Sequence, residues 1–238
     1  MKKSIVSKKS KRDPEANIFA NKSGLILHWL LTRGIEQKTF KLREIASDCD
    51  VSLGLVQKVL TLLIKKGIVK TVGVRTSKQF MLDDPTRLLE EWVENYDITK
   101  KCRITTFDSG FSGRTKLLDQ LKKSDLVSKV ALCLHTAADA YGYKHTNLET
   151  LELYLLDPGA KDELLALLDL EPQESGYKVL IVEPYYKSLL ETTQSHKKKF
   201  LLPPPLLTYL DLYHFPLRGI EQAEYLAENH PEIKRIQK

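Results

Sequence analysis

Residues 52–67, SLGLVQKVLTLLIKKG, decide how the first third of the chain is interpreted. The apolar side chains recur at the i, i+3, i+4, i+7 spacing of a helix with a single buried face: Val56, Val59, Leu60 and Leu63. Ser52 is a residue type that caps the start of a helix, and Gly67 is one that ends it. The stretch therefore predicts an amphipathic helix that packs on one side and faces solvent on the other.

The sequence on either side of this helix completes a recognisable unit. Two apolar-periodic segments precede it, residues 24–34 and 40–50, and both predict helices. Residues 68–82, IVKTVGVRTSKQFML, contain two short β-prone runs around Gly73, which is the pattern of a hairpin. Three helices followed by a hairpin predict a winged helix-turn-helix domain over residues 17–84.

The remainder of the chain has a mixed pattern. Residues 85–101 predict a connecting helix with Pro85 at its first position. Strands are expected near 102–107, 148–156, 177–184 and 198–205, and helices near 113–123, 126–142, 160–170, 205–213 and 218–226. We therefore expect an α+β protein in which the winged helix is followed by a mixed α/β domain over residues 102–238.

Charge is divided unevenly along the chain. Residues 1–80 contain 17 Lys and Arg against 6 Asp and Glu, whereas residues 81–238 contain 20 against 25. Six of the basic residues lie in the first twelve positions, and residues 1–16 have no apolar period, so they predict a disordered basic tail. Because 11 against 6 remain without that tail, the first third is expected to contact a polyanion.

Other features of the composition suggest a cytoplasmic protein. The three cysteines are far apart and form no zinc-binding or CxxC pattern, so we expect reduced thiols. No apolar run is long enough for a membrane span, and no signal-peptide pattern opens the chain. The histidines show no ligand spacing, so neither a metal nor a cofactor is expected.

The exposed face of the helix over residues 52–67 carries the candidate DNA-binding residues. A helix that enters the major groove needs a small residue for close approach and amide or basic side chains that reach base edges. In the hairpin, basic residues flanking Gly73 can reach the DNA backbone or the minor groove. The candidates are Ser52, Gly54, Gln57, Lys58, Thr61, Lys65, Arg75 and Lys78.

Two functions of other classes remain open at this point. A nucleotidyltransferase-like enzyme with a winged-helix targeting module would need two metal-binding carboxylates close together on a strand. Glu149 and Glu152 are three apart, hence on opposite faces of the expected strand, and no P-loop, GxGxxG, GxSxG or HExxH motif occurs. The loop Gly110–Arg114 is only weak evidence for a phosphate site, so no catalytic residue is predicted. A winged helix can also bind protein, which would make the chain an interaction adaptor.

The stretch Leu202–Leu226 gathers acidic, basic and aromatic residues near the end of the chain. Tyr209 and Tyr213 continue a helical apolar stripe, and Pro216 separates this helix from the next. Asp211 lies off the stripe, so it is expected either to pair with Arg218 across the break or to cap the following helix. Both alternatives describe a structural corner rather than an active site.

Three segments resemble the AbiEi-type antitoxins of type IV toxin–antitoxin systems: VSLGLVQKVLTLLIKKGIV, DDPTRLLEEWVENY and PLLTYLDLYHFPLRGIEQAEYL. The resemblance implies a transcriptional repressor that binds double-stranded DNA at its own promoter through the winged helix. It also implies a C-terminal domain that counters a toxin resembling a nucleotidyltransferase, without requiring a stable complex with that toxin.

Overall fold

The computed structural model describes residues 17–74, 78–191 and 200–237. The predicted basic tail of residues 1–16 and the candidate residue Arg75 lie outside these ranges. No helix of the described residues is both long and apolar enough to cross a membrane.

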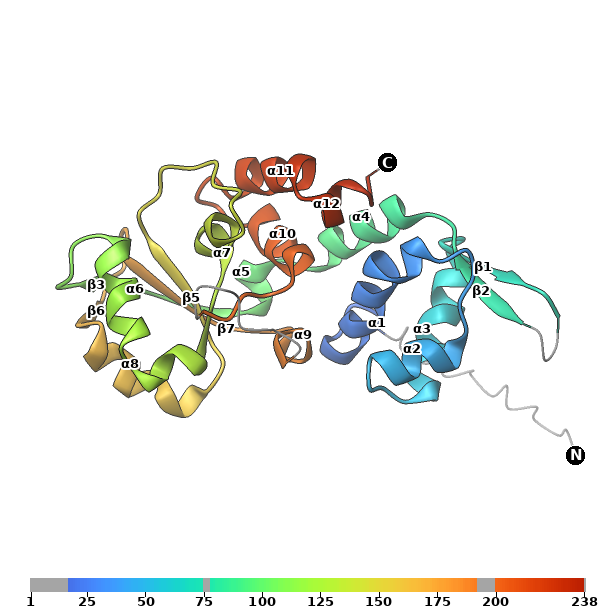
Figure 1. Ribbon diagram of the computed structural model, residues 1–238, viewed down its shortest axis with the longest axis horizontal. Coiled ribbons are helices and arrows are strands. Elements are labelled where there is room, and N and C mark those ends of the chain that lie inside the picture. Colours follow the sequence, from blue (N-terminus) through green and yellow to red (C-terminus); the bar gives the residue numbers. More distant parts are fainter. Residues whose placement is uncertain (1–16, 75–77, 192–199, 238) are drawn as a thin grey trace, which may run out of the picture.

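The N-terminal unit, defined here as described residues up to 84, consists of three helices and a hairpin (Figure 1). Its elements are α1 (Asn21–Thr32), the 3₁₀ turn η1 (Gly34–Glu36), α2 (Leu42–Asp48), α3 (Leu53–Lys65), β1 (Val69–Val72) and β2 (Gln79–Leu82). The strands pair antiparallel, with Val69 opposite Leu82. Helix α1 begins at Asn21, three residues before the start expected from the sequence.

The limits of α3 are those that its sequence predicts. The Ser52 hydroxyl accepts a hydrogen bond from the Leu55 amide at 3.2 Å, which satisfies one of the free amides in the first turn. At the other end Gly67 has φ +75°, a left-handed conformation that glycine adopts without strain. The predicted apolar residues Val56, Val59, Leu60 and Leu63 are all buried.

Beyond the hairpin, α4 (Pro85–Asn95) leads into the C-terminal domain. The expected connecting helix does not run unbroken to residue 101, because Tyr96 and Asp97 adopt extended backbone and a short helix, α5 (Ile98–Lys101), follows. The Asp97 carboxylate accepts a hydrogen bond from the Thr99 amide at 2.9 Å and thereby caps α5.

The C-terminal domain is built on a five-stranded mixed sheet with the order β4-β5-β7-β3-β6. Its strands are β3 (Arg103–Ser109), β4 (Val130–Leu132), β5 (Leu151–Leu155), β6 (Leu170–Pro172) and β7 (Val179–Glu183). Only β5 and β7 pair in parallel, and the other neighbours are antiparallel. Every residue of β5 is buried, because helices cover both faces of the sheet at this position.

The helices of this domain fall into two groups. Leucines of α6 (Arg114–Lys122) and α8 (Lys161–Leu167) share one hydrophobic cluster with alternate residues of β5. The other cluster joins the opposite face of the sheet to residues of α10 (Pro205–Tyr213) and α11 (Gly219–Asn229). The remaining short elements are η3 (Asp125–Ser128), α7 (Leu134–Ala140), η4 (Pro158–Ala160), α9 (Lys187–Glu191) and α12 (Pro231–Lys234).

The prediction of one long helix over residues 126–142 was wrong. The segment instead forms the end of η3, the strand β4 and the helix α7. Val130, Ala131 and Leu132 pair with β5, and Leu134 has φ +48°, which is incompatible with an uninterrupted helix. Sheet pairing therefore overrides the helical propensity of a leucine- and alanine-rich stretch. The short strand β6 was not expected either.

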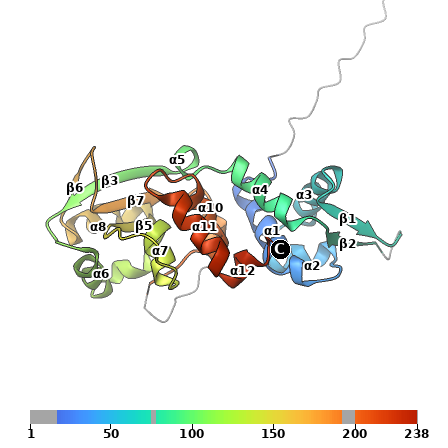
Figure 2. The same cartoon turned by 90° about the horizontal axis from the view of Figure 1, so that it is seen from above.

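The N-terminal unit and the C-terminal domain share one hydrophobic cluster. Figure 2 shows α1 and α4 on one side of this junction and α10 and α12 reaching it from the other. The Tyr186 hydroxyl accepts from the Trp92 indole and donates to the Phe19 carbonyl, both at 2.8 Å. Near the C-terminus, Arg235 donates to the Thr32 carbonyl at 2.7 Å. These contacts hold the two parts together as one packed body.

Candidate nucleic-acid interface

Helix α3 presents an exposed face opposite its buried one. All seven sequence-predicted DNA-binding residues that the structure describes are exposed, namely Ser52, Gly54, Gln57, Lys58, Thr61, Lys65 and Lys78. Six of them lie on α3 or at its cap, and Lys78 lies just before β2. The structure thus brings most of the predicted residues onto one helix face, with the hairpin beside it (Figure 1).

Gly54 lies at the second position of α3, where packing within the protein does not require a glycine. A Cβ built there would have no heavy atom within 4 Å. Glycine within a helix costs about 0.5–1 kcal/mol relative to alanine. Because nothing inside the protein explains that cost, the open space at Gly54 is available for an external surface to approach the helix closely.

Leu53 is an exposed apolar residue on this face that was not among the DNA-binding candidates chosen from the sequence. It is the first residue of α3, and 47% of its surface is exposed. An aliphatic side chain at the entrance of a groove-binding helix can contact the methyl group of thymine. Its sequence signal was available, because Leu53 lies off the apolar stripe of Val56 and Val59.

The hairpin extends beyond α3 and carries both apolar and basic side chains. Val72 and Val74 are 42% and 76% exposed, and Gly73 between them has φ +80°. The Lys78 ammonium lies 5.5 Å from the centre of the Phe80 ring, in the geometry of a cation–π contact. This contact orients Lys78 where the loop of the hairpin meets β2.

Ion pairs divide the lysines around α3 into two groups. Lys66 pairs with Glu91 at 2.8 Å, and Lys70 pairs with Asp83 at 2.7 Å. Within the described part of the chain, no ion pair involves Lys58 or Lys65. The charges on the exposed face of α3 are therefore less neutralised than those behind it.

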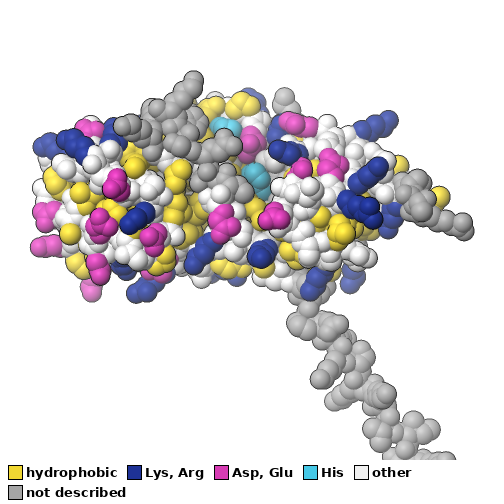
Figure 3. All heavy atoms as spheres, turned by 60° about the horizontal axis from the view of Figure 1, so that its bottom comes forward, with side chains coloured by type: hydrophobic (Ala, Val, Ile, Leu, Met, Phe, Trp, Pro, Cys, Tyr) yellow, Lys and Arg dark blue, Asp and Glu magenta, His cyan; other side chains and the backbone are white. Residues whose placement is uncertain are grey.

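Surface charge follows the same division at larger scale. In Figure 3, Lys and Arg side chains gather at the right-hand end, over the N-terminal unit, and Asp and Glu side chains are more frequent over the C-terminal domain. A basic surface beside an exposed helix face attracts polyanions such as DNA.

The expected pairing of Asp211 with Arg218 was wrong. Asp211 is fully buried, and its carboxylate accepts hydrogen bonds from the Tyr96 hydroxyl, at 2.7 Å, and from the Tyr154 hydroxyl. Arg218 instead binds Glu221, one turn along α11, and no side chain caps that helix. Burial accounts for the difference, because Asp211 faces the core on α10 while the Arg218 side chain remains near solvent.

Asp211 connects three parts of the fold. Tyr96 ends α4, Tyr154 lies in β5, and Asp211 lies in α10. Burial raises the pKa of the Asp211 carboxyl to about 7, although the hydrogen bonds from Tyr154 and Tyr96 act in the opposite direction. The hydrogen bonds of Asp211 therefore link the end of α4, the sheet and α10 to one another.

The corner between α10 and α11 depends on backbone geometry instead. Arg218 has φ +53°, and a Cβ at Gly219 would come within 2.3 Å of the Leu212 carbonyl oxygen. This close approach requires glycine at position 219. The corner therefore depends on the backbone of Arg218 and Gly219 and not on a pairing of Asp211 with Arg218.

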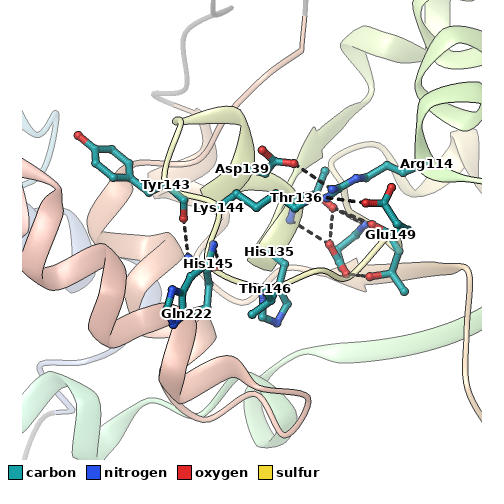
Figure 4. Close-up of polar contacts among 12 residues, drawn as sticks. Arg114, His135, Thr136, Asp139, Tyr143, Lys144, His145, Thr146, Glu149 and Gln222 are labelled. Atoms are coloured by element: carbon teal, nitrogen blue, oxygen red, sulfur yellow. Dashed lines mark hydrogen bonds and ion pairs between the residues drawn. The ribbon is translucent and has the colours of Figure 1, made fainter.

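Glu149 and Glu152 occupy different environments, and Figure 4 shows the ion pair of Glu149 with Lys144. Glu152 is fully buried and accepts hydrogen bonds from the Thr136 amide at 3.0 Å and from the Thr136 and Thr150 hydroxyls. Burial raises the pKa of the Glu152 carboxyl. Glu149 is exposed and pairs with Lys144 at 3.2 Å.

These two carboxylates do not form the paired metal site that nucleotidyl transfer needs. Among the residues that the structure describes, no group of three or more His, Cys, Asp or Glu side chains is arranged to hold a metal ion. Glu149 lies before β5 and Glu152 lies within it, so the positions of these two residues give no support to the enzymatic alternative.

Comparison with known protein families gives a match over most of the chain. A family model described as a transcriptional regulator, the AbiEi antitoxin of a type IV toxin–antitoxin system, matches residues 81–230. The match begins in β2 and extends through α11, so α1, α2 and α3 lie outside it. No curated protein and no solved structure matches the chain. Because the family model covers more than half of the sequence, the chain belongs to the AbiEi antitoxin family of transcriptional regulators.

Proposed function

We propose that the protein binds double-stranded DNA at its own promoter and represses transcription from it. In this proposal residues 17–84 form a winged helix-turn-helix domain, residues 85–101 connect it to the rest, and residues 102–238 form the regulatory antitoxin domain. The observation that carries the proposal is the exposed face of α3, with an uncovered Gly54 followed by Gln57 and Lys58 one turn later.

Each residue of this face has a role in the proposed complex. Gly54 allows the start of α3 to enter the major groove, and Gln57 and Lys58 reach base edges. Ser52, Thr61, Lys65 and Lys78 contact phosphates, as would Arg75, and Leu53 contacts a thymine methyl group. Ser52 remains able to donate its hydroxyl hydrogen to a phosphate while its oxygen accepts from Leu55.

Membership of the family supports the second half of the proposal. The family is described as regulator and antitoxin, which suggests that the C-terminal domain counters a toxin. We propose a nucleotidyltransferase-like toxin as the functional partner, in the cytoplasm and without a stable complex. Coexpression with the toxin and size-exclusion chromatography of the mixture would test both statements, since growth should be restored although the two proteins elute separately.

A footprint on the DNA upstream of the protein's own gene tests promoter binding directly. We expect a protected site whose affinity falls steeply between about 50 and 200 mM salt, because phosphate contacts release counterions. If no DNA fragment from this region is shifted or protected at either salt concentration, the winged helix would have to serve as a protein-binding adaptor instead.

Gly54→Ala should change stability and DNA binding in opposite directions. We expect unfolding to cost about 0.5–1 kcal/mol more, because alanine favours the helix and its Cβ meets no neighbour. Operator affinity should fall at least about fivefold, or roughly 1 kcal/mol, because the methyl group separates the helix from the groove. Urea unfolding and DNA titration measure the two effects. Higher stability with unchanged operator affinity would show that DNA does not approach Gly54.

Lys65→Ala should weaken binding to operator and to random DNA by the same factor. A phosphate contact carries no sequence information, so the slope of log affinity against log salt should decrease by about 1. The neighbouring Lys66→Ala is the matched control, because the Lys66 ammonium is held by Glu91 at 2.8 Å. Equal changes of slope for both variants would contradict the division between paired and unpaired lysines.

A further inference from the structure

A cavity of about 400 Å³ lies between α6 and α7 in the C-terminal domain. Its walls include Arg114, Leu118 and Lys122 of α6, Asp139 of α7, Leu132 of β4, and Phe200. Cavities of about 300–1,000 Å³ are the usual size of small-molecule sites. None of the residues proposed to bind DNA contributes to this cavity.

The α6 wall has a regular arrangement. Arg114, Leu118 and Lys122 follow one another at intervals of four, so they lie along one face of the helix over two turns, about 12 Å. An apolar residue therefore lies between two cations. Leu132 and Phe200 add apolar surface, and both are at least nine-tenths buried. The cavity therefore has both positively charged and apolar walls.

Arg114 is the more strongly positioned of the two cations. Its side chain is only 8% exposed, and Nη2 lies 2.9 Å from Oδ2 of Asp139 (Figure 4). This hydrogen bond uses one of the five N–H donors of the guanidinium, so others remain for a ligand. Asp139 fixes the orientation of the guanidinium, and burial strengthens its attraction for an anion.

Lys122 marks the other end of the α6 wall. Its ammonium lies 5.8 Å from the centre of the Phe200 ring and 3.0 Å from the Asp119 carboxylate. The pair with Asp119 is surface-exposed and hence weak, so a ligand can compete for the ammonium.

We propose that this cavity binds a small amphipathic monoanion, a carboxylate or sulfonate attached to an aliphatic or aromatic skeleton. The charged residues that line the cavity are two cations and one carboxylate, so they carry a net charge of +1. The anionic group lies on Arg114, and the apolar skeleton lies against Leu118, Leu132 and Phe200. The site provides this regulator with a place for a chemical effector that is separate from its DNA-binding surface.

A matched pair of fluorescent probes tests the proposal on the full-length protein. The probes are 1-anilinonaphthalene-8-sulfonate and N-phenyl-1-naphthylamine, which share a skeleton but differ in the sulfonate. We expect one sulfonate probe to bind per chain. Arg114→Gln should lower the affinity for the sulfonate probe about tenfold, because a charge-assisted hydrogen bond is lost, and the affinity for the neutral probe less than about twofold.

Two further comparisons keep the test decisive. Leu118→Trp should abolish binding of both probes by filling the cavity, whereas Lys122→Met should weaken only the sulfonate, about threefold. Lys123→Met, an exposed neighbour outside the cavity, is the matched control and should change neither. Thermal unfolding establishes that each variant is folded. If Arg114→Gln is not folded, the comparison of sulfonate-probe binding by Lys122→Met and Lys123→Met tests the proposal instead. The proposal would be overturned if Leu118→Trp bound both probes as tightly as the wild type does. It would also be overturned if removing the cation at position 114 or 122 weakened the binding of both probes equally.

Discussion

Asp211→Asn should remove a large part of the protein's loss of stability between pH 4 and pH 8. The Asp211 carboxyl is fully buried and its pKa is raised to about 7 by that burial, against 3.8 for the group in an ordinary environment. Asparagine has nearly the same shape and does not ionise. The difference in unfolding free energy between variant and wild type should therefore depend on pH in a defined direction.

The sign follows from proton binding. Below about pH 4 the carboxyl is protonated in both the folded and the unfolded state, so its contribution to stability is fully present. Between about pH 4 and 7 the folded chain retains a proton that the unfolded chain has lost, and stability falls as pH rises. Above pH 7 the contribution has been lost. A shift of this size corresponds to roughly 4 kcal/mol.

Urea unfolding across this pH range measures the effect. The free energy of unfolding of Asp211→Asn should increase relative to that of the wild type as pH rises. Asp162→Asn, on the exposed first turn of α8, serves as the matched control. At pH 5, Asp211→Ala should lose about 3 kcal/mol, because the buried hydroxyls of Tyr96 and Tyr154 lose their acceptor. A constant difference between Asp211→Asn and wild type at all pH values would show that Asp211 does not change its ionisation on folding.

The Asp211 cluster also illustrates what the sequence alone could not provide. The position of Asp211 near Pro216 suggested a local partner, but its two hydrogen-bond donors come from residues 96 and 154. No local pattern relates an aspartate to tyrosines so distant in the chain. The cavity beside Arg114 has the same origin, since it requires α6, β4 and α7 to meet.

Elements with strong local signals were predictable. Helix α3 has a capping serine, a regular apolar stripe and a terminal glycine, and the structure has the same limits. The strands β3, β5 and β7 were expected from β-prone runs, and the structure contains all three. The prediction for residues 126–142 was wrong because leucine and alanine suit a helix and a buried strand equally. Pairing with β5 decides between the two structures.

Gln57→Ala and Lys58→Ala should each weaken binding to the operator by about 1–3 kcal/mol, or roughly 5- to 150-fold. Both residues are exposed on α3 one turn after Gly54, where a helix in the major groove reaches base edges. Random DNA offers no matched base edge, so its affinity should change much less. The fold should be unaffected, because neither side chain is buried.

Residues of the same types in the C-terminal domain provide controls, namely the half-buried Gln120 and the exposed Lys123. Gln120→Ala and Lys123→Ala remove an amide and a charge at the end of α6, far from α3 in Figure 1. Neither should alter operator affinity by more than about twofold. Since Lys123→Ala also lowers the net charge by one, it separates a base contact at Lys58 from a general loss of positive charge.

Whether α3 reads the operator sequence is decided by the ratio of operator affinity to random-DNA affinity. We would determine this ratio for the wild type, Gln57→Ala and Lys58→Ala at about 50 and 200 mM salt. Sequence reading by α3 predicts that both substitutions reduce this ratio at least about fivefold at both salt concentrations, while the Gln120 and Lys123 variants leave it unchanged. An unchanged ratio in the Gln57 and Lys58 variants would show that this face of α3 does not read the operator.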